Sequence, residues 1–264
     1  MEVLMMDCKV LKGTASIKSP HFCQVLDRGI IDGRFNYLIM TMVGRNLWDL
    51  RMEREQCLMA IEDLHTVGFL HRDIKPGNFC MGKAEAKDSH TVYLLDFEKD
   101  QDLRRPRDTA PFRGTTRYAA IATLYQKEQS RKDDLEAWMY MIVEWTAGSL
   151  PWKHLTGKDK ADVLAWKEVI RDEEDALHDF LAMCPQRQFS RVLKYLYSLT
   201  YISIPDYMFV HSCLANAAKT MKVDANQPLD WDLSTPYHGP TLKDREERIK
   251  VGKAVKTDRT KEAR

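Results

Sequence analysis

Apolar residues in the early part of the chain come in short unbroken runs. The run FNYLIMTMV at residues 35–43 contains β-branched and aromatic side chains, which predicts a buried strand that ends before Gly44. Two shorter runs, Phe79–Met81 and Val92–Leu95, are separated by a polar stretch that includes residues 82–90. This arrangement predicts a hairpin with a long exposed tip.

Apolar residues at helical spacing dominate the rest of the chain. Residues 53–67 carry them every three or four positions, and Gly68 follows as a helix C-cap. Further helices are predicted near residues 161–171, 188–199 and 207–221. Because the strand-like runs are short and early, the sequence predicts an α+β fold that is mainly helical.

The clearest helix is predicted at residues 130–147. Ser130 with Asp133 makes a capping-box pattern at its start, and Gly148 followed by Pro151 ends it. Its apolar side chains are expected to share one face. They are Leu135, Trp138, Met139, Ile142, Val143 and Thr146.

Two segments lack such patterns. Residues 98–117 are charged and contain proline, which predicts a long loop of the kind that often carries function. From Thr241 onward the chain is polar, with nine basic and five acidic residues. We expect residues 241–264 to form a solvated charged tail.

Composition narrows the class of protein. Lys and Arg number 40 against 39 Asp and Glu, which argues against a generic nucleic-acid binder because such proteins carry a strong basic excess. None of the six cysteines forms a C-x-x-C pair, so a zinc site is not expected. No apolar run approaches the roughly 18 residues of a membrane span, and the N-terminus does not match a signal peptide. We expect a protein of the cytoplasm or nucleus, monomeric because no heptad pattern occurs.

The stretch HRDIKPGN at residues 71–78 matches the catalytic-loop pattern H-R-D-x-x-x-x-N at every defined position. In that chemistry Asp73 accepts the proton of a substrate hydroxyl, and Lys75 offsets charge on the transferred phosphate. Asn78 and Asp96 supply oxygens to a magnesium ion. Asp96 follows the apolar run that begins at Val92, where a metal-binding Asp is expected.

Longer motifs extend this similarity. The stretches GFLHRDIKPGNF, FRGTTRYA and GRNLWDLR, with RKDDLEAWMYMIVEW, GSLPW and IPDY further on, resemble the casein kinase 1 superfamily of Ser/Thr protein kinases, and within it the tau-tubulin kinase-like branch. The resemblance covers roughly residues 20–232. It implies a protein kinase-like fold that uses ATP and Mg²⁺ to phosphorylate protein Ser and Thr.

The resemblance also implies roles for individual residues. The backbone around Met42 is the hinge that meets adenine, with Met40 at the back of the pocket, and Asp134 braces the catalytic loop from below. Arg113 and Arg117 line the substrate groove, where an anion site favours acidic or already phosphorylated substrates. Lys158 or Lys160 joins them in this reading, and the alternative is a solvated basic face.

The sequence departs from the kinase pattern before the catalytic loop. It contains no G-x-G-x-x-G loop and no V-A-I-K-like strand that supplies the phosphate-pairing lysine. Glu2 is the candidate for the helix glutamate that normally pairs with that lysine, and so for a nucleotide-binding residue. We therefore expect residues 1–43 to be the remnant of a truncated β-rich N-lobe, and residues 44–240 to form a complete helical C-lobe.

Two further departures follow the catalytic loop. Glu98 replaces the glycine of Asp-Phe-Gly and adds a negative charge near the phosphates. At about 5 Å and an effective dielectric near 20, like charges repel by roughly 3 kcal/mol. Ala120 and Ala122 stand where the superfamily has Ser and Asn, so two hydrogen-bonding side chains of the substrate-loop anchor are absent.

Three readings remain open at this point. The first is an active Ser/Thr kinase, supported by Asp73, Lys75, Asn78 and Asp96. The second is a catalytically impaired pseudokinase that acts as a binding or scaffold module. It is supported by Glu98 and by the missing phosphate clamp, which is the Gly-rich loop together with the phosphate-pairing lysine. The third is a truncated gene record whose upstream exon carries the clamp.

Overall fold

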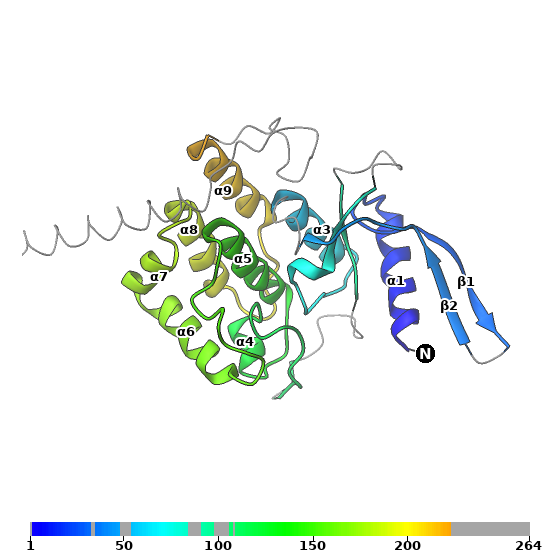
Figure 1. Ribbon diagram of the computed structural model, residues 1–264, viewed down its shortest axis with the longest axis horizontal. Helices are drawn as coiled ribbons and strands as arrows, with labels where there is room; N and C mark the ends of the chain where they lie inside the picture. Colours follow the sequence, from blue (N-terminus) through cyan, green and yellow to red (C-terminus); the bar gives the residue numbers. More distant parts are fainter. Residues whose placement is uncertain are drawn as a thin grey trace, which may run out of the picture.

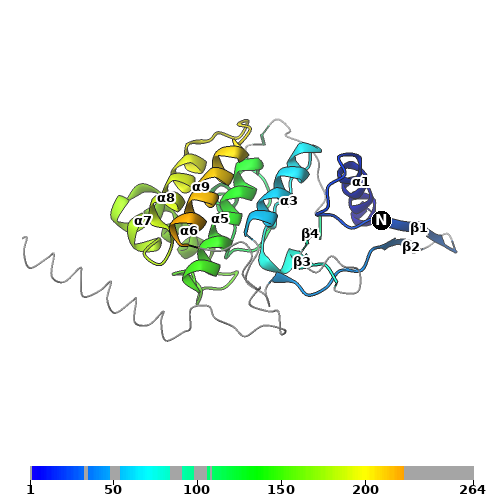
Figure 2. The ribbon, with the colours of Figure 1, turned by 90° about the horizontal axis from the view of Figure 1, so that it is seen from above.

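The computed structural model describes residues 2–32, 35–47, 54–83, 91–97, 106–107 and 109–222. In Figures 1 and 2 a helix and a two-stranded ribbon lie at one end of the molecule. The other end consists of packed helices, and the catalytic-loop segment lies between the two ends. Glu98 and residues 241–264 lie outside the described residues.

The first end is built from one helix and one ribbon. Helix α1 (Glu2–Ser16) packs against strands β1 (Val25–Ile31) and β2 (Phe35–Met40), which pair in antiparallel register with Gly29 opposite Tyr37. Strand β2 confirms the predicted strand but not its predicted burial, since none of its residues is buried, and it ends at Met40, three residues before the end of the predicted range. Leu38 packs against the core, whereas Phe35 and Ile39 are exposed.

The middle of the molecule carries the second ribbon. Helix α3 (Arg54–Thr66) is followed by Gly68, whose positive φ of 87° fits the predicted C-cap. A 3-10 turn, η1 (Pro76–Asn78), leads into β3 (Phe79–Met81), which pairs with β4 (Val92–Leu94). The predicted hairpin is therefore confirmed, although most of its predicted tip lies outside the described residues.

The helical end is organised around α5 (Arg131–Ala147). Ser130 and Asp133 form the predicted capping box, and Gly148 ends the helix in the left-handed conformation. Burial extends beyond the apolar positions predicted to share one face, because every residue from Asp133 to Val143 is buried. Helices pack around α5 on several sides, so its polar residues must find partners inside the protein.

Shorter helices surround α5. They are α4 (Ile121–Leu124), α6 (Lys160–Asp172), α7 (Glu174–Phe180), α8 (Gln186–Ser198) and α9 (Tyr207–Thr220). Helices α6, α8 and α9 match the predicted ranges within two residues, whereas α7 was not predicted. Figure 2 shows α7, α8 and α9 side by side at the far end from α1. Among the described residues, no helix combines the length and apolarity needed to cross a membrane.

Candidate active site

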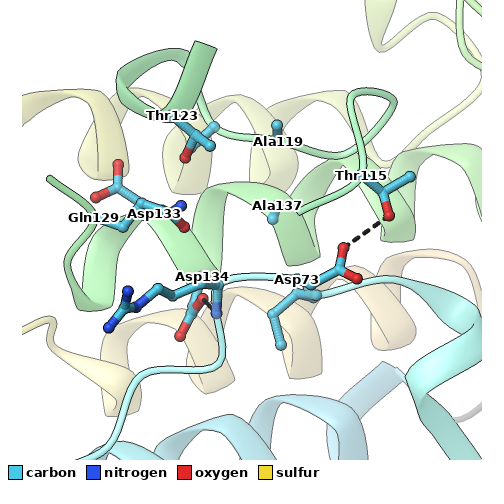
Figure 3. Close-up of a pocket in the computed structure, with 11 residues that line it drawn as sticks. Asp73, Thr115, Ala119, Thr123, Gln129, Asp133, Asp134 and Ala137 are labelled. Atoms are coloured by element: carbon cyan, nitrogen blue, oxygen red, sulfur yellow. Dashed lines mark hydrogen bonds between the residues drawn. The ribbon is translucent and has the colours of Figure 1, made fainter. Parts of the chain in front are cut away.

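The carboxylate of Asp73 is held at both of its oxygens. Thr115 donates a hydrogen bond from Oγ1 to Oδ1 over 2.7 Å, and Lys75 forms an ion pair with Oδ2. Figure 3 shows the bond from Thr115, which comes from a loop 42 positions further along the chain. The Asp73 carboxylate therefore has a fixed orientation, with a hydroxyl on one side and an ammonium on the other. The sequence reading did not assign Thr115 to this site.

The backbone before Asp73 is held by the buried carboxylate of Asp134. Oδ2 accepts hydrogen bonds from the amide of His71 over 2.8 Å and from Nε2 of His65 over 2.9 Å. Oδ1 accepts one from the amide of Arg72 over 2.8 Å. Burial alone would raise the pKa of Asp134, but these donors and the charges of His65 and His71 hold it below its usual value. The role that the resemblance implied for Asp134 is confirmed by this geometry.

Residues 109–120, the loop before α4 that we call the substrate loop, lie directly against the catalytic loop at Gly114. Arg72 has a φ of 68° and Gly114 a φ of 103°, both in the left-handed region. A Cβ on Gly114 would lie 2.6 Å from the carbonyl oxygen of Arg72, which is too close for any side chain. Only glycine therefore allows this approach, and it brings Thr115 to Asp73. Between the two loops remains a cavity of about 10 Å³, room for a single water molecule (Figure 3).

The two predicted metal ligands, Asn78 and Asp96, lie in segments held by backbone hydrogen bonds. The side-chain Nδ2 of Asn78 donates to the backbone carbonyl of Asp73 over 2.9 Å, which leaves Oδ1 as the ligand for a cation. Asp96 has a φ of 63°, a conformation that a non-glycine residue rarely adopts. His71 holds Leu95, the residue before Asp96, because Nε2 of His71 lies 2.9 Å from the carbonyl oxygen of Leu95.

The residues present fit a magnesium ion. Carboxylate and amide oxygens are the ligands that Mg²⁺ prefers, and it usually takes only one or two carboxylates from the protein beside phosphate oxygens. The described residues contain no group of three or more His, Cys, Asp or Glu that would make a complete protein cage. Asp96 and Asn78 are therefore the side chains that would hold Mg²⁺ together with a nucleotide.

An acidic residue of α1 faces the Asp96 segment, and it is Asp7. The pKa of Asp7 is raised, mainly by burial and also by the charge of Asp96. A hydrogen bond from the backbone amide of Phe97 acts against this and lowers it. Phe97 itself stacks on Phe22 and contacts His71 edge-on, both with ring centroids 5.8 Å apart. The sequence reading named Glu2 instead, whose side chain lies outside the described residues.

The predicted hinge follows β2 as an extended segment. The backbone amide of Thr41 donates to the carbonyl of Gln24 over 3.0 Å. The backbone amide of Gly44 donates to the carbonyl of Met81 over 2.6 Å. Met42 lies between these two anchors and is 74% exposed. The segment is thus tied at both ends, with Met42 exposed between them.

The two predicted anion-binding arginines differ. Arg117 donates to the carboxylate of Glu144 over 3.1 Å and to the carbonyl of Lys153 over 3.1 Å. A guanidinium already paired with a carboxylate attracts a further anion less strongly. The carbonyl of Arg113 accepts from Gln129, and its partly buried side chain lies on the same loop. Lys160 lies over the ring of Phe112, 3.6 Å from the centroid, so this cation also contacts the loop.

A buried lysine of α6 holds the far end of the substrate loop. Nζ of Lys167 donates to the carbonyls of Ala119 and Arg117 over 2.6 and 3.2 Å and lies over the rings of Tyr140 and Trp152. Burial lowers the pKa of Lys167 to about 7, against the charge of Glu136, which raises it. The sequence reading missed this residue, because a lysine between apolar residues of an amphipathic helix gives no sign of burial.

Comparisons with known proteins agree with this geometry. A family model described as the protein kinase domain matches residues 29–214. The chain is 33% identical over 87% of its length to serine/threonine-protein kinase spe-6 of Caenorhabditis elegans, and 31% identical over 84% of its length to a probable serine/threonine-protein kinase of Dictyostelium discoideum. Casein kinase I homolog 1 of Schizosaccharomyces pombe is 28% identical over 76% of the chain.

The matched regions make up 64%, 48% and 50% of these three relatives in that order, so the chain spans about half to two thirds of their length. The family match itself covers most of the chain and includes the catalytic loop, Asp96, the substrate loop and Asp134. The chain belongs to the protein kinase family.

Proposed function

We propose that this chain transfers the γ-phosphate of ATP to Ser or Thr hydroxyls of proteins, as a member of the casein kinase 1 superfamily and of its tau-tubulin kinase-like branch. The observation that carries the proposal is the fixed carboxylate of Asp73, held between Thr115 and Lys75. The family and its Ser/Thr kinase relatives support the reaction class.

Each residue has a role that follows from its contacts. Asp73 accepts the proton of the substrate hydroxyl, and Thr115 orients the carboxylate for that step. Lys75 lies on the same carboxylate and offsets negative charge on the transferred group. Mg²⁺, when bound with ATP, neutralises phosphate charge, and Asn78 with Asp96 holds it. The backbone of Met42 receives the base.

The substrate class follows from the basic loop. Arg113 and Lys160 lie on or beside the segment that follows the catalytic loop, and they favour an acidic or already phosphorylated protein substrate. We propose a monomeric enzyme of the cytoplasm or nucleus.

A phosphotransfer assay tests the proposal. The chain and its Asp73→Asn variant are incubated with Mg-ATP and casein or an acidic peptide, and phosphate incorporation is measured. The variant should lose at least about 100-fold in rate, because the proton acceptor is gone. Equal signals from the two proteins would refute kinase activity of this chain.

The second candidate is a nucleotide-binding pseudokinase, which the glutamate at position 98 favours. It predicts that Mg-ATP raises the melting temperature while both proteins transfer no phosphate, since a ligand bound only by the folded state stabilises it.

A further inference from the structure

The outer face of α6 carries an apolar pair between acidic residues. Trp166 and Val169 are 45% and 42% exposed, and Asp162 and Glu173 stand at the same helical face on either side of them. The adjoining face of α6 is buried through Val163, Lys167 and Ile170. An exposed Trp beside an aliphatic residue is a typical anchor for a binding partner.

The surroundings of this pair are strongly acidic. Residues 159–179, which cover α6 and α7, contain eight Asp and Glu against three Lys and Arg, and one of those three is the buried Lys167. Most of the acidic residues are exposed. We refer to the exposed residues of α6 and α7 around Trp166 as the acidic Trp face. Its charge selects a basic partner with at least one apolar side chain.

The chain itself contains such a segment. Residues 241–264 hold nine basic and five acidic residues, and Ile249, Val251 and Val255 are placed among the lysines. A basic segment of this kind complements the acidic Trp face in charge, and its aliphatic residues match the apolar pair. Lysine and arginine side chains also bind favourably against a Trp ring.

The position where the described chain ends allows this contact. Thr220, at the end of α9, accepts a hydrogen bond from Gln188 of α8 over 3.1 Å. Gln186, at the start of α8, donates to the carbonyl of His178 in α7 over 2.9 Å. The end of α9 is therefore joined through α8 to the acidic Trp face. The 18 residues of segment 223–240 can span up to about 60 Å when extended, well beyond the roughly 20 Å length of α6.

We propose that residues 241–264 bind in cis to the acidic Trp face, with an aliphatic side chain against Trp166 and Val169. Its lysines and arginines lie beside the flanking carboxylates. Because the tether keeps the segment at a millimolar effective concentration, even a weak contact is populated. The face lies on the same helix as Lys160 and Lys167, which contact the substrate loop from a different side of α6.

Limited trypsin digestion of the full chain measures the contact directly. Cleavage within residues 241–264 is followed by mass spectrometry at low protease, where its rate reports the population of the undocked segment. A synthetic peptide of residues 241–264 gives the rate for the free segment. We expect cleavage in the chain to be at least about fivefold slower than in the peptide, and to approach the peptide rate as salt rises from 50 to 500 mM.

Two variants locate the contact. Trp166→Ala with Asp162→Asn changes only exposed side chains and should return cleavage to the peptide rate. Ile249→Ser with Val251→Ser keeps every trypsin site and should do the same. Met208→Ala removes an apolar side chain of α9 that is even more exposed, at 71%, and should leave the protection unchanged.

Three outcomes would overturn the proposal. Cleavage at the peptide rate in the unmodified chain means that the segment does not dock. Protection that survives Trp166→Ala with Asp162→Asn means that it docks elsewhere. Protection that grows with protein concentration means that the occupant is the segment of a second copy. None of these readouts depends on kinase activity, so the proposal stands or falls separately from the proposed function.

Discussion

Substituting Asp134 by Asn tests whether one buried carboxylate holds the catalytic loop. The change keeps the size of the side chain but leaves only one oxygen to accept hydrogen bonds. Three donors meet the carboxylate in the structure, the amides of His71 and Arg72 and Nε2 of His65. In the variant, the new NH₂ group must face at least one of these donors.

The cost follows from those contacts. A buried donor left without an acceptor costs about 1–3 kcal/mol, and each of the two remaining bonds loses roughly 1 kcal/mol when its acceptor is no longer charged. The free energy of unfolding should therefore fall by about 3–5 kcal/mol, similar to other broken buried charge networks. For a domain of this size, that lowers the melting temperature by about 6–20 °C.

The assay is thermal unfolding at several pH values. The pKa of Asp134 is lower in the folded than in the unfolded chain, so its stabilisation is complete above the unfolded pKa of about 3.9 and is lost as pH falls through the folded value. The difference in melting temperature between wild type and variant should be constant near neutral pH and shrink below about pH 4. The exposed Asp175→Asn serves as control and should change stability by less than about 0.5 kcal/mol. An Asp134→Asn melting temperature within about 2 °C of wild type at pH 7 would refute the reasoning.

Three further predictions concern the loops around Asp73. Thr115→Val should lower kcat about tenfold by removing the hydrogen bond to Asp73, whereas Thr115→Ser should stay within about threefold of wild type; equal rates for the two variants would contradict the role of the hydroxyl. Gly114→Ala should abolish most activity, because its Cβ would lie 2.6 Å from the Arg72 carbonyl, whereas Gly77→Ala, with no atom nearer than 4.0 Å, should be tolerated; kinase rates of both variants decide this. Lys167 has a pKa of about 7 in the folded protein, below its unfolded value near 10.4. Between these two pH values the unfolded chain binds one proton more than the folded chain. The free energy of unfolding of the wild type should therefore rise by up to about 1.4 kcal/mol per pH unit over this range. Denaturant unfolding between pH 7 and 9 should show a smaller rise in Lys167→Met, and parallel pH dependences would contradict a buried titrating lysine.

The sequence predicted those parts of the site that depend on neighbours in the chain. Asp73, Lys75 and Asn78 occupy one turn, and their placement follows from the motif and from η1. The helices were recognised because capping residues and apolar spacing are local signals, as Ser130 and Gly148 show.

The parts that the sequence did not predict depend on contacts between distant segments. Thr115 meets Asp73 only because Gly114 allows two loops to touch, and no local pattern reports that approach. The contact of Asp7 with Phe97 was not predicted, because only the packing of α1 shows which acidic residue of the helix faces that segment. The burial of α5 on all sides was not predicted for the same reason, since the number of helices packed around it is a property of the whole fold.

The substrate loop shows how a missing side chain is replaced by backbone contacts. Ala120 and Ala122 were expected to weaken its anchor, because they lack the hydrogen-bonding groups found in related kinases. In the structure the carbonyls of Arg117 and Ala119 accept from Lys167, and the amide of Ile121 donates to the buried carboxylate of Glu136 over 2.9 Å.

These bonds use only main-chain atoms of the loop, which every residue type other than proline supplies. The identity of the side chains at positions 120 and 122 therefore matters little for the anchor, whereas the buried Lys167 and Glu136 matter greatly. Ala120→Ser should leave activity within about twofold of wild type, whereas Glu136→Gln should lower both stability and kcat, because the buried acceptor loses its charge. If Ala120→Ser raises kcat severalfold and Glu136→Gln has no effect, the anchor lies in the side chains after all.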